Sequence, residues 1–293
     1  MNRKDFGEIV RALRKEQLDE NYQPWTQAKL TKETSLSLEV IRRIERGQKK
    51  IIQEEELTLL ADAFQLTSSE RRQFFFASLN IAESKVPRRE NDPETVLDML
   101  RAYLSGVRQP AYVSDNYHDA VLANGSIVAL LNLQTAVQTA RTAPAGFNVA
   151  RIGFDPDIGF LQLMGPDAER HAIYDMRYFR ERTFLTRHTA YFNYVLHHLR
   201  KFRQFDRYWR EIQYENGDYL SGNMTYAYEH PQFGPLHYVS VESVTLTGAG
   251  TLSTIIYVPK NENTTTVFEL LARKCGTEVF RLAPWPDKDG LMP

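Results

Sequence analysis

The stretch WTQAKLTKETSLSLEVIRRIERGQKK (Trp25–Lys50) decides how the first part of this chain folds. Thr26 predicts the start of a helix that runs to about Glu33, because its hydroxyl can accept a hydrogen bond from an unpaired backbone N–H. Ser37 predicts the start of the next helix for the same reason, and Gly47 predicts its end. The stretch therefore predicts two short helices joined by a tight turn, which is helix-turn-helix spacing.

More helices are expected on both sides of this pair. Apolar residues with the spacing of an amphipathic helix occur upstream at Phe6, Ile9, Val10 and Leu13, and downstream at Leu57, Leu60, Ala61 and Phe64. Thr67 and Glu70 have the spacing of a capping box and predict a fifth helix. The segment SKVPRRENDP that follows holds two prolines and almost no core residues. We expect a helix-turn-helix domain over residues 1–83, a linker over 84–93 and a second domain over 94–293.

Charge is concentrated near the predicted helix pair. The 293 residues hold 36 Lys and Arg against 37 Asp and Glu, a net charge of −1, which excludes a uniformly basic protein that coats nucleic acid. Residues 1–50, however, hold 12 Lys and Arg against 8 Asp and Glu, a net charge of +4. Affinity for DNA depends on such local positive charge, because neutralised phosphates release counterions.

WTQAKL and SLSLEVIRRIERGQKK resemble the Xre-type (lambda-repressor-like) helix-turn-helix. Thr26-Gln27 would open the second helix of that fold, Ser37 would open the recognition helix, and Glu45-x-Gly47 would end it. The resemblance implies that Gln27 lies near the DNA backbone. It implies that four residues contact the major groove: Ser37, Leu38, Glu39 and Arg42. Arg43 would contact either the groove or a phosphate, and Lys49 and Lys50 would contact phosphates.

A protein-interaction module, antitoxin-like or a scaffold with no DNA role, is the main alternative for this domain. In that case the basic residues would only form a solvated face. Even within a DNA-binding domain, Glu39 could simply pair with Arg42 or Arg43 on the helix surface.

The rest of the chain changes from helical to strand patterns. Helices are predicted at Glu94–Leu104, Asp167–Gln213 and Asn263–Lys274; strands at Gln109–Asp115, Asp119–Asn124, Asn223–Glu229, Leu236–Thr247 and Thr251–Val258. Two strands, three or four helices and three strands form an α+β order, with helices covering an antiparallel sheet. The helical region is rich in Phe and Tyr, so the aromatic residues either fill a core or line a cavity for a small molecule.

Three regions of this second part resemble the MmyB-like regulators, in which an Xre-type helix-turn-helix precedes a PAS-like ligand-binding domain. They are PAYVSDNYHDAVLANGSIVALL (110–131), NVARIGFDP (148–156), and EHPQFGPLHYVSVESVTL with LSTIIYVP (229–246 and 252–259). The resemblance implies a regulator in which a ligand enters the PAS-like domain and changes the affinity for DNA.

The ligand site is expected around Asn148 and Arg151, which lie three residues apart on one helical face, with Phe154 near them. A buried Arg requires an anionic partner, so Arg151 and Asn148 would hold the head group of an elongated apolar ligand such as a fatty acid. Candidate walls for its tail are Tyr112, Tyr191, Phe192, Tyr194 and Tyr257. Alternatively, Arg151 pairs within the protein with Asp155 or Asp157.

No motif argues for an enzyme, since the sequence lacks HExxH, a Walker A loop and GxSxG. With one cysteine, Cys275, it can form no internal disulfide, and we expect no metal or cofactor. The N-terminus has no signal-peptide pattern, and no apolar run could span a membrane, so we expect a cytoplasmic protein. One recognition helix reads few base pairs, so we also expect a homodimer. An enzyme that uses the second domain is the remaining, weaker alternative.

Overall fold

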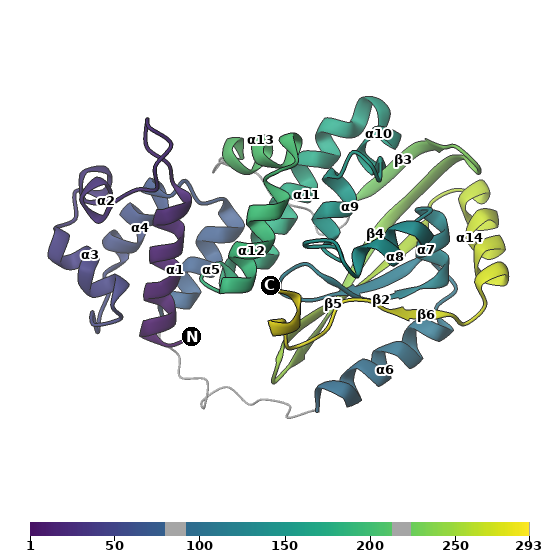
Figure 1. The fold of residues 1–293 in the computed structure, drawn as a ribbon, viewed down its shortest axis with the longest axis horizontal. Coiled ribbons are helices and arrows are strands. Elements are labelled where there is room, and N and C mark those ends of the chain that lie inside the picture. Colours follow the sequence, from purple (N-terminus) through teal and green to yellow (C-terminus); the bar gives the residue numbers. More distant parts are fainter. Residues whose placement is uncertain (80–91, 213–223, 293) are drawn as a thin grey trace. The chain divides into compact units, whose positions relative to one another are not determined.

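The computed structural model describes residues 1–79, 92–212 and 224–292, and the chain divides into two compact units. The N-terminal unit begins with the five helices that the sequence predicts (Figure 1). They are α1 (Arg3–Glu16), α2 (Gln27–Thr34), α3 (Leu38–Glu45), α4 (Glu54–Ala63) and α5 (Ser68–Ser78). Of the predicted linker, residues 84–91 lie outside the described residues.

The predicted caps start these helices. Thr26 accepts a hydrogen bond from the backbone of Lys29, Ser37 accepts one from the backbone of Val40, and Thr67 forms a reciprocal capping box with Glu70. The apolar faces of the five helices enclose one core, built around Phe6, Ile9, Val10, Leu13, Leu30, Ile41, Ile44, Leu60, Phe64 and Phe74.

A later segment of the chain, Thr183–Asn193, belongs to the same unit. Phe184 is fully buried and lies edge-on to Phe74, with 6.5 Å between the ring centroids. Arg187 is also fully buried; its guanidinium forms an ion pair with Glu70 and another, at 3.3 Å, with Glu16. This segment therefore completes the helical core from outside the first 79 residues.

The C-terminal unit is built on a six-stranded antiparallel sheet with strand order β3-β4-β5-β1-β2-β6. The strands are β1 (Ala111–Ser114), β2 (Ala120–Asn124), β3 (Thr225–His230), β4 (Gly234–Thr247), β5 (Gly250–Pro259) and β6 (Val279–Arg281). The predicted α+β class is thus confirmed, and five of the six strands were predicted. β6 was not predicted, because three residues are too few to show an alternating pattern.

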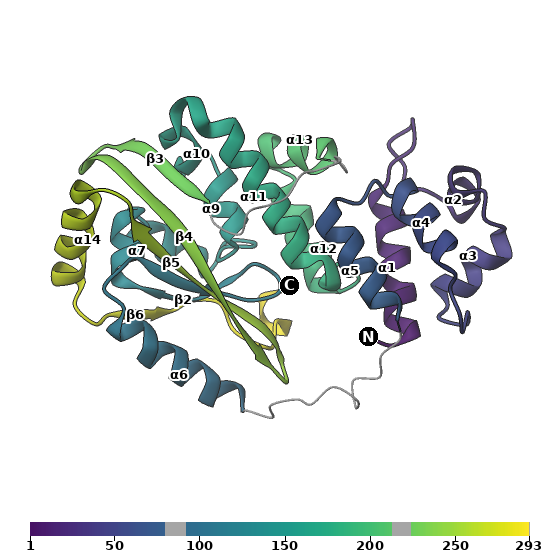
Figure 2. The ribbon, with the colours of Figure 1, turned by 180° about the vertical axis from the view of Figure 1, so that it is seen from behind.

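Each face of the sheet is covered by helices. On one face, α6 (Pro93–Gly106) packs Val96, Leu97, Leu100 and Leu104 against β1 and β2 (Figure 2). On the other face, Tyr226, Tyr238 and Tyr257 form a tyrosine cluster with α7 (Gly125–Leu130) and α14 (Glu262–Cys275). In the described residues, no helix is both long and apolar enough to cross a membrane.

The region between β2 and β3 holds more helices than the three or four predicted. After α7 come α8 (Gln134–Ala140), α9 (Val149–Phe154), α10 (Phe160–Leu163), α11 (Ala168–Thr183), α12 (Ala190–Leu199) and α13 (Arg203–Glu211). Several are only one or two turns long, too short for an apolar stripe to be recognised. The long helical stretch predicted over 167–213 is broken by a 3-10 turn at Phe184–Thr186 and by a turn at 200–202.

Candidate functional site

The helix α3 presents a charged face outward. Glu39, Arg42 and Arg43 are exposed, whereas Ile41 and Ile44 on the opposite side are buried in the core. Ser37, at the start of the helix, is exposed, and Leu38 is half-buried. The side chains that would have to reach a DNA groove are therefore not packed against their own domain.

The cations of this face differ in whether they have a partner. The guanidinium groups of Arg42 and Arg43 form no ion pair or hydrogen bond within the part of the chain that the structure describes, so Glu39 does not pair with either of them. Lys50 is exposed as well. Lys49, in contrast, is half-buried and pairs with Glu56 at 3.1 Å. The two arginines are thus available to an outside anion without the loss of an internal contact.

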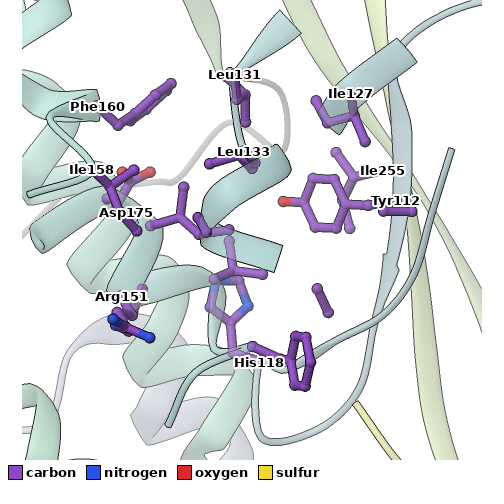
Figure 3. A pocket seen from close by; sticks show the side chains of 18 of the residues that line it. Tyr112, His118, Ile127, Leu131, Leu133, Arg151, Ile158, Phe160, Asp175 and Ile255 are labelled. Atoms are coloured by element: carbon purple, nitrogen blue, oxygen red, sulfur yellow. The ribbon is translucent and has the colours of Figure 1, made fainter. Parts of the chain in front are cut away.

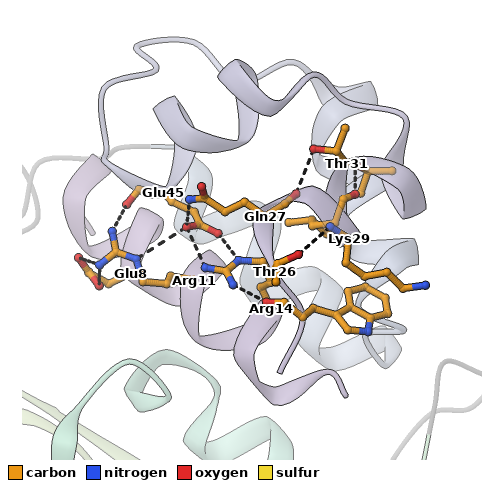
Figure 4. Close-up of polar contacts among 11 residues, drawn as sticks. Glu8, Arg11, Arg14, Thr26, Gln27, Lys29, Thr31 and Glu45 are labelled. Atoms are coloured by element: carbon orange, nitrogen blue, oxygen red, sulfur yellow. Dashed lines mark hydrogen bonds and ion pairs between the residues drawn. The ribbon is translucent and has the colours of Figure 1, made fainter. Parts of the chain in front are cut away.

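Glu45 ties α3 to the neighbouring helices, a role that the sequence did not reveal (Figure 4). Its carboxylate is 1% exposed and accepts hydrogen bonds from Arg14 Nε at 2.6 Å and from Gln27 Nε2 at 2.8 Å. Arg11 donates to the backbone carbonyl of Glu45 at 3.3 Å. The Glu45-x-Gly47 pattern marked the end of the helix, but the carboxylate accepts its hydrogen bonds from residues 18 and 31 positions away.

The C-terminal unit contains a cavity of about 120 Å³ between the sheet and the helices α7 to α11 (Figure 3). Most of its wall is apolar and includes Ile127, Leu131, Leu133, Ile158, Phe160 and Ile255. Polar groups reach it from α9, α11 and the sheet, namely Arg151, Tyr174, Asp175, Tyr178, Ser240 and Glu242. An apolar cavity with a few polar groups is the usual form of a small-molecule site.

Three of the predicted ligand residues line this cavity: Tyr112, Arg151 and Tyr257. The rings of Tyr112 and Tyr257 meet edge-on at 6.5 Å, on neighbouring strands. The guanidinium Nε of Arg151 lies 3.0 Å from Asp155 Oδ2, so the internal pairing left open by the sequence is the one that forms. The charge of Arg151 is therefore already balanced by the residue that follows α9.

The other five predicted residues lie elsewhere. Asn148 is fully buried, where it caps α9 and donates hydrogen bonds to Asp119 and to the backbone of Tyr117. Phe154 packs edge-on against Phe205. The remaining three are Tyr191 and Phe192, which belong to the segment in the N-terminal unit, and Tyr194, which contacts His198. Since their types suit both a core and a pocket wall, the sequence could not separate the two.

Asp175 is a cavity residue that the sequence analysis missed. Its carboxyl Oδ2 lies against α9 at Gly153, where an added Cβ would come within 3.3 Å of it. Burial raises the pKa of Asp175 to about 7. The available signal was its place among aromatic residues on α11, three positions from Tyr178. His118, from the loop between β1 and β2, also lines the cavity, and burial lowers its pKa to about 3, so its imidazole is neutral.

A second buried charge cluster lies at the loop between β1 and β2. Lys288 lies 2.6 Å from Asp115 and 3.0 Å from Asp119, and all three are buried. The cluster fixes the C-terminal segment to the loop between β1 and β2. Among the described residues, no group of His, Cys, Asp or Glu is arranged to hold a metal ion.

Comparison with known proteins identifies one domain. The family model of the MmyB-like transcription regulator ligand binding domain matches residues 94–271, which span the elements from α6 into α14 and nearly all of the cavity wall. No curated protein matches the chain. The matched region is more than half of the 293 residues. With five helices before it that are consistent with a helix-turn-helix, the chain belongs to the MmyB-like transcription regulator family.

Proposed function

We propose that this protein is a sequence-specific DNA-binding transcription regulator whose DNA affinity changes when the cavity of the C-terminal unit is occupied. The observation that carries the proposal is the exposed face of α3, where Arg42 and Arg43 lack internal partners in the described chain. Arg can bond guanine O6 and N7 with two hydrogen bonds, and it also binds phosphate well.

The other residues predicted to contact DNA differ in whether their side chains are free or held within the protein. Ser37, Leu38 and Glu39 lie on the accessible side of α3 and would reach base edges with Arg42. Lys50 would contact phosphate directly, whereas Lys49 would first have to leave Glu56. Gln27 is held by Glu45, so its contribution would be to fix the position of α2 against α3. Because a single α3 covers few base pairs, we propose that the regulator binds as a homodimer. The expected cytoplasmic location also stays a prediction.

The ligand is proposed to be a small apolar molecule, with a fatty acid as the class suggested by the sequence. A cavity of ~150 Å³ lined by aliphatic and aromatic residues accommodates benzene. The cavity here, at about 120 Å³, therefore suits a ring or a short alkyl segment, and a longer chain would need the walls to move. A carboxylate at Arg151 would have to compete with Asp155.

A paired substitution tests the DNA proposal. In the full-length protein, Arg42→Ala with Arg43→Ala should lower affinity for a selected DNA fragment by about tenfold or more, since each well-placed Arg contributes about 1–3 kcal/mol. The dependence of log affinity on log salt should also become shallower, by about 0.9 for each lost phosphate contact.

The matched control removes the same charge from exposed positions of the C-terminal unit, Arg170→Ala with Arg273→Ala. We expect this variant to bind DNA with nearly unchanged affinity. Equal retention of DNA by both variants would contradict the proposal. If the Arg42→Ala, Arg43→Ala variant still binds DNA but no longer binds a protein that the wild type binds, the protein-interaction alternative is favoured.

A further inference from the structure

The charged groups that border the cavity have an unusual arrangement. Asp175 lies on α11 and borders the cavity, as Figure 3 shows, with Arg151 and His118 on other parts of the wall. Its carboxyl forms no hydrogen bond or ion pair within the described ranges 1–79, 92–212 and 224–292. The side chain of Asp175 is half-buried, so the carboxyl can be reached from the cavity. Such a group inside a cavity is well placed to bind a ligand.

The cations near the cavity already have carboxylate partners. Arg151 pairs with Asp155 at 3.0 Å. Arg182, near the C-terminal end of α11, pairs at 2.8 Å with Glu242, which borders the cavity. His118 is neutral, because burial lowers its pKa to about 3. No unpaired positive side chain among the described residues that line the cavity therefore faces an incoming anion, whereas Asp175 offers an unpaired acceptor.

The surroundings of Asp175 leave room for its carboxyl and place hydroxyl groups around the same cavity. Gly153 on α9 leaves room for Oδ2, which a larger residue would crowd. The hydroxyl-bearing residues that border the same cavity are Tyr112, Tyr174, Tyr178, Tyr226, Tyr257 and Ser240. Burial raises the pKa of each of these tyrosines, so all stay neutral near pH 7 and can donate or accept hydrogen bonds.

We propose that Asp175 anchors the ligand, and that the ligand is a compact apolar molecule ending in a primary amine rather than in a carboxylate. The ammonium group would donate hydrogen bonds to Asp175 and pair with its charge in a water-poor cavity, where such bonds are strong. A carboxylate would instead meet a like charge at the same place. This inference rests on the proposed ligand-binding function of the cavity, but not on DNA binding.

A matched ligand series tests it on the full-length protein. Octylamine, octan-1-ol and octanoate share the same unbranched carbon chain and differ only in the polar group, so any movement of the cavity walls that the chain requires is the same for all three. Their dissociation constants are measured by titration calorimetry near pH 7.5, below the concentrations at which they aggregate. We expect octylamine to bind at least about tenfold more tightly than octanoate, a difference of about 1.4 kcal/mol.

Two variants assign the preference to one residue. Asp175→Asn should remove most of the advantage of octylamine while octan-1-ol still binds, which also shows that the cavity is intact. Asp98→Asn makes the same change at an exposed position on α6, across the sheet from the cavity, and should leave the ranking unaltered.

The outcomes separate the inference from the function it rests on. If none of the three molecules binds, both the inference and the binding of alkyl chains in this cavity are wrong. If octanoate binds more tightly than octylamine, ligand binding stands and the role of Asp175 is overturned. If Asp175→Asn keeps the preference for octylamine, another group anchors the amine and the assignment to Asp175 fails.

Discussion

Glu45 shows how one buried side chain positions the recognition helix. Its carboxylate joins α3 to Arg14 on α1 and to Gln27 on α2, away from water. A buried ion pair adds little stability over an apolar pair of the same volume, but removing one partner leaves a buried charge without compensation. Glu45 therefore acts mainly by fixing the position of α3 against α1 and α2, and its removal should destabilise the N-terminal unit.

Glu45→Ala is expected to destabilise the N-terminal unit by about 3–5 kcal/mol, because it leaves the buried Arg14 guanidinium without its carboxylate. Denaturant unfolding followed by circular dichroism measures the change. Glu8→Ala is the control, since Glu8 also pairs with an arginine, Arg11, but more than a third of each side chain is exposed. That substitution should cost at most about 1 kcal/mol; equal effects of the two would show that Glu45 has no special role.

Asp175 predicts a dependence of stability on pH. Burial raises its pKa in the folded state from 3.8 to about 7, so the folded protein binds this proton more tightly than the unfolded chain. Its contribution to stability is therefore fully present below about pH 4 and falls as the pH rises to about 7. The free energy of unfolding of Asp175→Asn, measured by urea titration across this range, should lack that decline. A variant that keeps the full decline would place the titrating group elsewhere.

The sequence identified some of the residues that line the cavity but not Asp175. Tyr112, Arg151 and Tyr257 were predicted and border the cavity, whereas Tyr191, Phe192 and Tyr194 do not. An aromatic residue has the same local pattern in a core and in a cavity wall, and only long-range packing decides between them. Asp175 was not predicted, because the acidic head group expected for the ligand requires a cation rather than a carboxylate.

Among the elements, the crossing of α1 and α3 depends on Gly7. A Cβ at this position would lie 2.5 Å from the carbonyl oxygen of Ile44 and 2.7 Å from that of Glu45. Both are backbone atoms, so they can move away only if α3 itself shifts. Glycine is thus required here by the close approach of two helices rather than by its own backbone angles.

Gly7→Ala sets two effects against each other. Alanine favours a helix by about 0.8–1 kcal/mol relative to glycine. Overpacking against a rigid neighbour costs about 1–3 kcal/mol, so we expect net destabilisation and a displaced α3. Thermal unfolding should show a lower Tm, and DNA affinity should fall in parallel. A higher Tm with unchanged DNA affinity would contradict the close crossing.

Side-chain capping made the element boundaries of the N-terminal unit predictable. Thr26, Ser37 and Thr67 act within three residues of the N–H groups they bind, so the sequence carries this information locally. The short helices α7 to α10 and the strand β6 depend on the sheet against which they pack. Apart from the helical face expected at Asn148 and Arg151, which coincides with α9, their positions could not be predicted, because a pattern of three to seven residues has no clear period.

At the scale of the whole chain, residues distant in sequence complete the N-terminal unit. Phe184 and Arg187 come from within the region matched to the ligand-binding domain, yet they pack with Phe74, Glu70 and Glu16. Neither contact could be inferred from the sequence, since a separation of more than a hundred residues leaves no periodic signal. A domain boundary at residue 83 would thus cut away part of the core of that unit.

A fragment of residues 1–83 is therefore expected to be less stable than the same helices in the full chain. Removing Phe184 exposes apolar core surface, and removing Arg187 leaves the buried Glu70 without its ion-pair partner. A large buried aromatic residue alone contributes about 3–5 kcal/mol. Hydrogen exchange of α5 amides, compared between fragment and full-length protein, measures the difference. Equal protection in the two would mean that the segment adds nothing to the core.

Selection of bound fragments from random-sequence DNA tests the central claim most directly. The full-length protein should enrich one common motif, with half-sites about one helical turn apart if it binds as a homodimer. The Arg42→Ala, Arg43→Ala variant should enrich none. The proposal that α3 recognises DNA bases would be contradicted if the wild-type protein enriches no sequence, or if the variant enriches the same motif.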